Sequence, residues 1–208
     1  MRHFYSFMFY LLLPLVVLRL LWRAIKAPAY AKRWAERFGF IPKVENQPRI
    51  WLHAVSVGET LAAVPMIKQL LAGYPAHQLL ITTTTPTGSE RVQALFGGES
   101  RIEHCYAPYD LPDCLYRFLN RARPEILIVM ETELWPNTIA ACQQRGIASI
   151  VANARLSAKS ARGYQKFSAL TRPMLKSISC VAAQNSVDGE RFVELGLPES
   201  QLSVTGSI

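Results

Sequence analysis

Two short polar stretches that interrupt apolar runs have residue types and spacing suited to ligand binding. The first, Ser-Val-Gly-Glu-Thr at 56–60, ends an apolar run and precedes an alanine-rich helical pattern. Gly58 lets the backbone approach a ligand closely, and the free N–H groups at the start of a helix favour an anion. We therefore predict that Ser56, Gly58, Glu59 and Thr60 bind a negatively charged ligand.

The second stretch, TTTPTGSER at 83–91, follows the next apolar run and repeats this pattern. Thr87, Gly88 and Ser89 precede or open a helical segment, so they are candidates for the same kind of site. An ordinary helix cap is the alternative in both stretches, with Ser56 or Thr87 accepting hydrogen bonds from the free amides. The sequence leaves both interpretations open.

A third stretch, METELWPN at 130–137, places two acids at the end of an apolar run. If the strand continues through them, alternation puts the side chains of Glu131 and Glu133 on the same face. Paired acids at the end of a strand suggest a site, and capping of the helix after Trp135 is the alternative use.

A fourth stretch, NARLS at 153–157, offers Asn153, Arg155 and Ser157 to a carboxylate or phosphate. Arg155 is suited to bidentate contact with such a group. An ion pair with an acid of the protein itself is the alternative for Arg155.

The residue types that mark other classes of site are missing or scattered in this sequence. There is no GxGxxG after the first apolar run and no Walker A sequence, which argues against an NAD enzyme and a P-loop NTPase. His53 lies inside an apolar run and is expected in the core. The four cysteines lack CxxC spacing, so we expect no metal site and no disulfide framework, and a reducing compartment. They are Cys105, Cys114, Cys142 and Cys180.

The elements that must position these residues alternate between strand and helix. Such alternation predicts a Rossmann-like, doubly wound parallel sheet covered by helices on both faces, with ligands at the carboxyl ends of the strands. The strand-like runs are 50–56, 79–85, 103–108, 125–131, 147–152, 178–184 and 202–206, and the helical patterns are 59–72, 88–96, 111–121, 136–145, 160–176 and 186–195.

The N-terminal residues differ in character from this α/β body. Residues 4–18 carry no charge, and the chain as a whole has a net charge of +8, which favours an anionic partner. We expect a membrane-anchoring segment at 1–22, a basic helical hairpin at 23–44, a linker at 41–49 and the α/β domain at 45–208. Spanning and interfacial placement both remain open, as does a signal peptide. The basic residues after the apolar run are Arg19, Arg23, Lys26, Lys32, Arg33 and Arg37.

Seven motifs together resemble one enzyme family. KAPAYAKRWAERFGF, LHAVSVGET, TTTTPTGSERV, YAPYDLP, METELWPN, NARLS and AAQN occur in this order along almost the whole chain. They resemble the transferases of 3-deoxy-D-manno-octulosonic acid (Kdo) in lipopolysaccharide synthesis. The resemblance implies a GT-B enzyme without a required metal or other cofactor, which moves Kdo from CMP-Kdo to the lipid A precursor, lipid IVA, with inversion.

The resemblance also implies a division of labour and a location. The N-terminal half receives the lipid acceptor, the C-terminal half holds CMP-Kdo, and the enzyme lies on the cytoplasmic face of the inner membrane, in contact with anionic lipid. This chain ends where the second half would begin, so we expect an acceptor-binding domain that is inactive alone.

By the same resemblance, Glu36 is the catalytic base and the METELWPN acids belong to the active cleft. From the residues alone, Glu36 sits one turn from Lys32 and Arg33 in a short helix between Pro28 and Gly39, where a surface ion pair is the alternative. Two other functions remain open: a GT-B transferase for another nucleotide sugar, and a non-catalytic, membrane-associated glycolipid-binding domain. The positive charge gathers near the apolar N-terminus, so nucleic-acid binding is not expected.

Overall fold

A computed structural model describes residues 1–43 and 47–208, and the described residues form a seven-stranded sheet in which every neighbouring pair is parallel. The strand order, β3-β2-β1-β4-β5-β6-β7, is that of a doubly wound fold. This confirms the predicted fold class. The strands are β1 (Arg49–His53), β2 (Gln78–Thr83), β3 (Ile102–Tyr106), β4 (Ile126–Met130), β5 (Ala148–Ala154), β6 (Cys180–Ala183) and β7 (Leu202–Val204).

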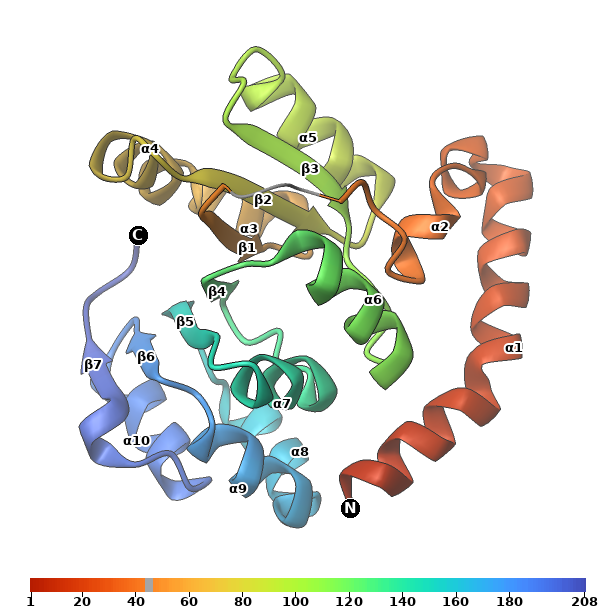
Figure 1. The fold of residues 1–208 in the computed structure, drawn as a ribbon. Coiled ribbons are helices and arrows are strands. Elements are labelled where there is room, and N and C mark those ends of the chain that lie inside the picture. Colours follow the sequence, from red (N-terminus) through yellow and green to blue (C-terminus); the bar gives the residue numbers. More distant parts are fainter. Residues whose placement is uncertain (44–46) are drawn as a thin grey trace.

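Helices cover both faces of this sheet (Figure 1). Side chains alternate along β1, so that Ile50 and Leu52 join the core beneath one set of helices, while Trp51 joins the core beneath the other. The first set is α3 (Val57–Ala62), α4 (Val64–Gly73) and α5 (Pro86–Phe96); the second is α6 (Pro112–Ala122), α7 (Pro136–Gln144), α8 (Ala158–Lys166), α9 (Ser168–Lys176) and α10 (Ser186–Glu194), with the short 3₁₀ helix η2 (Glu199–Gln201) before β7.

Two of the predicted helices are each divided in the structure. The pattern at 59–72 becomes α3 and α4, because Pro65 begins a new helix within its first two positions. The pattern at 160–176 becomes α8 and α9, because Phe167 leaves the helical conformation at φ −111°, ψ 37°. Periodicity does not detect such breaks, since the apolar face continues across them.

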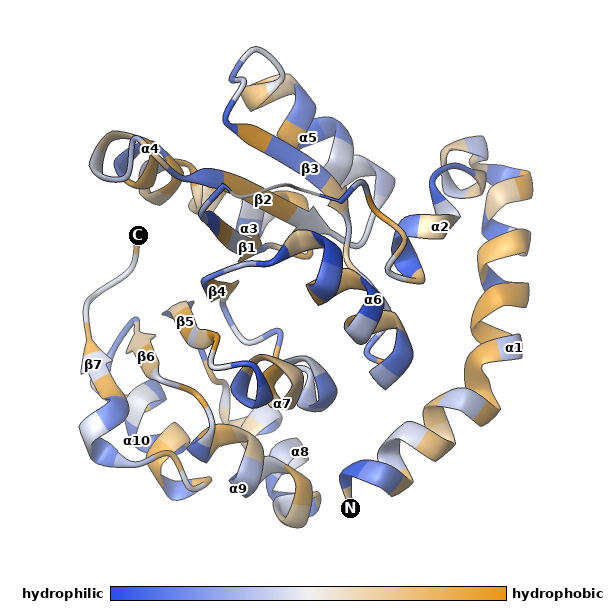
Figure 2. Cartoon of the chain, in the orientation of Figure 1, coloured by the Kyte–Doolittle hydropathy of each residue, from blue (hydrophilic) through white to orange (hydrophobic). Residues whose placement is uncertain are grey.

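The N-terminal residues form a long helix beside the body (Figure 1). Helix α1 (Arg2–Lys26) has 25 residues, which corresponds to about 38 Å, and Pro14 lies inside it. The 3₁₀ helix η1 (Pro28–Ala31) and α2 (Trp34–Arg37) follow. Figure 2 shows that α1 is mostly hydrophobic. Residues 44–46, with the expected boundary between residues 44 and 45 and part of the expected linker, lie outside the described residues.

Two polar contacts near the N-terminus of α1 attach this helix to the α/β body. The Ser6 hydroxyl lies 3.2 Å from Oδ1 of Asn137 in α7, and the Tyr10 hydroxyl donates to Asp113 of α6 at 2.6 Å. The helix is therefore attached to the face formed by α6 and α7.

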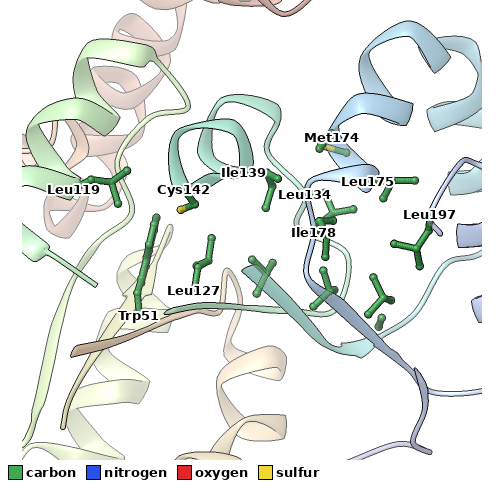
Figure 3. Packing of buried hydrophobic residues seen from close by; sticks show 14 of the residues in the cluster. Trp51, Leu119, Leu127, Leu134, Ile139, Cys142, Met174, Leu175, Ile178 and Leu197 are labelled. Atoms are coloured by element: carbon green, nitrogen blue, oxygen red, sulfur yellow. The ribbon is translucent and has the colours of Figure 1, made fainter. Parts of the chain in front are cut away.

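The larger core lies between the sheet and the second set of helices (Figure 3). Within this core the Trp51 and Phe118 rings lie 4.7 Å apart between centroids, and Phe118 is fully buried. The Trp51 indole N–H donates to Thr82 Oγ1 at 2.8 Å, so its one polar atom is satisfied. Close packing of this kind is what positions the strand ends.

We predict that Phe118→Ala lowers the free energy of unfolding by about 3–5 kcal/mol, because it leaves a cavity beside Trp51. Tyr116→Ala, on the exposed side of the same helix, should change it by about 0.5 kcal/mol or less. Urea unfolding followed by tryptophan fluorescence measures both, and equal effects would contradict this assignment of the core.

Candidate functional site

The carboxyl ends of the strands meet at one edge of the sheet, where the strand order reverses between β1 and β4. Ligands of doubly wound folds bind outside this edge at such a reversal. The four predicted polar stretches all follow strands that end here, after β1, β2, β4 and β5.

The stretch after β1 forms a capping box. Ser56 Oγ accepts from the Glu59 N–H at 3.2 Å, and Glu59 Oε2 accepts from the Val55 N–H at 2.8 Å. Thr60 Oγ1 donates to the Ser56 carbonyl at 2.9 Å. The capping alternative is therefore realised at Ser56, and a Cβ built on Gly58 would meet nothing nearer than Ser56 Oγ at 3.8 Å. The space above Gly58 is open to a ligand.

The stretch after β2 is also a helix start, but the cap lies two residues before the one predicted. Thr85, not Thr87, accepts from the Gly88 N–H, at 3.1 Å, because the helix begins at Pro86 and the cap must precede it. Gly88 packs closely, since a Cβ there would lie 3.2 Å from Thr83 Cβ. Ser89 is 7% exposed and accepts from Arg33 Nη1 at 3.1 Å.

Glu36 lies in α2 and is bound at both carboxylate oxygens. Oε1 pairs with Arg33 Nε at 2.7 Å, and Oε2 accepts from the Tyr106 N–H at 2.7 Å. The predicted ion pair thus forms with Arg33. Arg33 also donates to the His104 carbonyl at 2.8 Å, so one guanidinium joins Glu36, Ser89 and β3. Burial, then the charge of Arg33, lowers the pKa of His104 to about 3.

Arg37, the residue after Glu36, connects the hairpin to the loops after β1 and β2. Its Nη2 donates to the Thr84 carbonyl at 3.0 Å, and Thr84 Oγ1 donates to the Val55 carbonyl at 3.3 Å. The guanidinium lies over the Tyr106 ring at 4.1 Å, and burial lowers its pKa. Sequence reasoning missed this residue because it counted Arg37 only as membrane-facing charge.

Three carboxylates gather where the strand order reverses. Burial raises the pKa of Glu133, and the charges of Glu59 and then Glu131 add to this. Burial also raises the pKa of Glu59, although hydrogen bonds from Val55 and Ser56 oppose the shift. The alternation argument for Glu131 and Glu133 was wrong, because β4 ends at Met130 and Glu131 turns away with φ 56°. The turn, not the strand, brings the acids together.

The residues after β5 are used in three different ways. Asn153 is buried with φ 54°, and its Oδ1 accepts from the Ile208 N–H at 3.2 Å. The Arg155 side chain is exposed, and within the described residues it forms no ion pair, so its predicted bridge to an acid is not found there. Ser157 caps α8 by accepting from the Ser160 N–H at 3.1 Å.

A cavity of about 400 Å³ lies between α1, the hairpin and this edge of the sheet, within the usual range for ligand sites of about 300–1,000 Å³. Arg37 and Asp110 are its charged residues. Its walls are otherwise mostly apolar and come from α1, β1 and the segments after β2, β3 and β4: Phe9, Val16, Trp51, His53, Val55, Thr84, Ala107, Pro108, Tyr109, Trp135 and Thr138.

His53 lies in the core, as the sequence predicted. His53 is buried, its Nδ1 lies 2.9 Å from Thr82 Oγ1, and burial lowers its pKa to about 4, so it is neutral. The four cysteines are free; Cys105, Cys114 and Cys142 are buried, and Cys180 is partly buried.

The doubly wound parallel sheet with its crossover helices defines the class: a Rossmann-like α/β domain. Similar solved structures include a UDP-GlcNAc 2-epimerase from Neisseria meningitidis, with TM-score 0.57 and 16% identity over 76% of this chain and 46% of that chain. A putative UDP-N-acetylglucosamine 2-epimerase from Listeria monocytogenes has TM-score 0.57 and 10% identity, covering 77% of this chain and 45% of that one. These likenesses concern the fold.

The chain belongs to the Kdo transferase family. The family model described as "3-Deoxy-D-manno-octulosonic-acid transferase (kdotransferase)" matches residues 32–208. A 3-deoxy-D-manno-octulosonic acid transferase of Haemophilus influenzae is 44% identical over 209 residues, which cover 100% of this chain and 48% of that protein. One of Bordetella pertussis is 38% identical over 76% of this chain and 37% of its own length. The chain thus spans about half the length of the curated relatives it matches, or less.

We predict that Glu133→Gln stabilises the chain at pH 8 by on the order of 1 kcal/mol. The folded-state pKa of Glu133 is raised above its ordinary value of 4.5, so the ionised carboxylate costs stability above that pKa and nothing below 4.5. The gain should therefore disappear as the pH falls to about 4.5.

Unfolding in urea at several pH values measures this gain, with Glu90→Gln on the exposed side of α5 as the matched control. A loss of stability at pH 8 would show that the Glu133 charge is structurally required.

Proposed function

We propose that this chain is the acceptor-binding half of a glycosyltransferase that moves Kdo from CMP-Kdo to the lipid A precursor, lipid IVA, with inversion and without a metal. Family membership over residues 32–208 supports the sugar that is transferred. The assignment to the acceptor-binding half depends on one observation. The hairpin holds Glu36 at the carboxyl edge of the sheet, where the Glu36 carboxylate accepts a hydrogen bond from the Tyr106 N–H.

Glu36 is the general base of this proposal, because an inverting transfer needs a group that removes the proton from the attacking hydroxyl. A carboxylate has about four acceptor positions, and in Glu36 one position on each oxygen is occupied, by Arg33 and by Tyr106. The remaining positions can accept from a sugar hydroxyl. The two existing contacts fix the orientation of the carboxylate.

The other residues of the predicted site form an acidic group and a neutral or basic group along the carboxyl edge of the sheet. The cluster of Glu59, Glu131 and Glu133 repels a phosphate but accepts hydrogen bonds from sugar hydroxyls. Anionic groups of the ligands are therefore expected on the hairpin side or at Arg155. The remaining residues of the proposed substrate site supply backbone N–H groups, hydroxyls or an amide: Ser56, Gly58, Thr60, Thr87, Gly88, Ser89 and Asn153.

The membrane-facing element of the proposal is the outer side of α1, whose 25 residues are long and apolar enough to cross a bilayer. The same helix contacts Asn137 and Asp113 of the body, and a spanning helix would have to give up these contacts. An interfacial position on the cytoplasmic face of the inner membrane satisfies both requirements, with basic residues facing anionic lipid. The exposed stripe is Phe4, Phe7, Leu11, Leu15, Leu18, Trp22 and Ile25.

For the catalytic role, we predict that Glu36→Gln lowers Kdo transfer by on the order of 10²-fold or more in a chain completed by the C-terminal half of a relative. Glutamine keeps an acceptor for the Tyr106 N–H but has no charge to take up the proton. Transfer from CMP-Kdo to lipid IVA is the assay, with Glu90→Gln as the control. The 208-residue chain alone is expected to bind lipid IVA without turnover.

Near-normal transfer by Glu36→Gln would remove Glu36 from this role. Binding of lipid IVA without turnover in the completed chain would instead favour a non-catalytic glycolipid-binding domain, and transfer from another nucleotide sugar would change the donor.

For the membrane contact, we predict that Leu15→Asp weakens binding to anionic vesicles by at least about tenfold, because it places a charge in the apolar stripe. Leu61→Asp, at an exposed leucine of α3, is the matched control and should have little effect. Vesicle flotation measures both, and binding should also fall as salt screens the basic residues. Equal binding by the two variants would contradict contact through α1.

A further inference from the structure

Arg37 is a buried cation with incomplete hydrogen bonding. The residue is 6% exposed, its Nε has no hydrogen-bond partner in the described structure, and its Nη2 reaches only the Thr84 carbonyl. Among the described residues it pairs with no carboxylate. A buried charge of this kind is costly unless something pairs with it.

A second buried arginine shows the usual solution. Arg49, in β1, also has unpartnered nitrogen atoms, but its Nη2 pairs with Glu103 at 2.9 Å and donates to Gln78 Oε1 at 2.9 Å. Arg37, in contrast, has no such pair among the described residues and lines the 400 Å³ cavity beneath α1. An anion that pairs with Arg37 therefore has space to bind in this cavity.

Among the described residues, the acid that lines this cavity is Asp110, and its carboxylate is directed elsewhere. Asp110 accepts from the N–H groups of Asn137 and Thr138 at 3.0 and 2.7 Å and from Thr138 Oγ1 at 2.7 Å. It caps α7 with both oxygens and forms no ion pair with Arg37. An anion that enters the cavity thus meets a cation that forms no ion pair with a carboxylate of the described residues.

The walls indicate what the anion is attached to. Phe9 and Val16 of α1 line the cavity together with Val55, Pro108 and Trp135, so the guanidinium shares this space with apolar side chains. A small inorganic anion would leave this apolar surface uncovered. An acyl chain would bury it, and the removal of apolar surface from water favours binding.

We propose that this cavity binds part of the lipid acceptor, with a phosphate of the glycolipid on Arg37 and a segment of one acyl chain between α1 and Trp135. This rests on the proposed function for the identity of the lipid. The outer side of α1 contacts the bilayer in that function, so an acyl chain passes from the membrane to the cavity around the same helix. Arg37 then orients the acceptor next to Glu36.

The probe for this site is dodecyl phosphate below its micelle concentration, added to the whole 208-residue chain with Trp22→Phe and Trp34→Phe. The remaining tryptophans, Trp51 and Trp135, both line the cavity, so their fluorescence reports binding. Dodecyl phosphate should bind at least tenfold more tightly than dodecyl maltoside and tenfold more tightly than inorganic phosphate. Equal binding of inorganic phosphate would reduce the site to a simple anion site and overturn the proposal.

Two pairs of variants test the two parts of the site. Arg37→Met should weaken binding of dodecyl phosphate by at least tenfold, and Arg37→Lys should restore part of it. Val16→Phe, which fills the cavity from α1, should weaken binding of dodecyl phosphate, while Leu15→Phe on the exposed side of the same helix should not. Unchanged binding by Arg37→Met or by Val16→Phe would overturn the proposal.

The stability of the Arg37→Met variant shows whether Arg37 serves ligand binding or only the folded structure. Because the unliganded chain gains little from an unpaired buried charge, Arg37→Met should keep or raise the urea midpoint of unfolding while it loses ligand affinity. A lowered midpoint together with unchanged affinity would assign Arg37 to structure alone.

Competition identifies the source of the anion. Lipid IVA should displace dodecyl phosphate at lower concentration than phosphatidylglycerol does, and the reverse order would overturn the assignment to the acceptor. None of these measurements requires a donor or turnover. A negative result in these binding measurements therefore does not contradict Kdo transfer by the completed chain. A negative result in the transfer assay does not contradict the lipid site.

Discussion

The attachment of the basic hairpin to the carboxyl edge of the sheet is the interaction on which the site depends. Glu36 accepts the Tyr106 N–H, and the Tyr109 N–H donates to the Arg37 carbonyl at 2.7 Å. Gly39 makes the close approach possible: it has φ 84°, and a Cβ there would lie 2.1 Å from the Cys114 carbonyl oxygen. These contacts fix Glu36, close one side of the cavity and set the path of α1.

Because the hairpin is attached there, charged groups of opposite sign lie at different places along the carboxyl edge of the sheet. Cationic groups lie on the hairpin side, where Arg33 and Arg37 contact β3 and its neighbours, and carboxylates lie at the reversal between β1 and β4. Backbone strain occurs on both sides of this division, since Arg33 in the hairpin has a φ of 58°, and Glu131 and Asn153 have φ values of 56° and 54°. Such conformations cost on the order of 1 kcal/mol or more and gather at functional sites. The edge is suited to a ligand that is both sugar and anion.

The fold was predictable from sequence because the strands of a covered parallel sheet are nearly continuous apolar runs, and Ile126–Met130 is a clear case. The site was less predictable because it depends on where each element ends. Pro86 moved the cap of α5 from Thr87 to Thr85, and the end of β4 at Met130 removed the alternation assumed for Glu131 and Glu133. Arg37 was missed because its burial depends on Thr84 and Tyr106, which are distant in sequence.

Mapping the acceptor by photo-crosslinking tests the central claim most directly. Lipid IVA that carries a diazirine on an acyl chain would be irradiated with the membrane-bound enzyme completed by a C-terminal half, and the labelled peptides identified by mass spectrometry. We expect labels in α1 between Phe9 and Val16 and in the segment after β3 at 107–110. Labels confined to α8 and α9, or to the amino edge of the sheet, would contradict it.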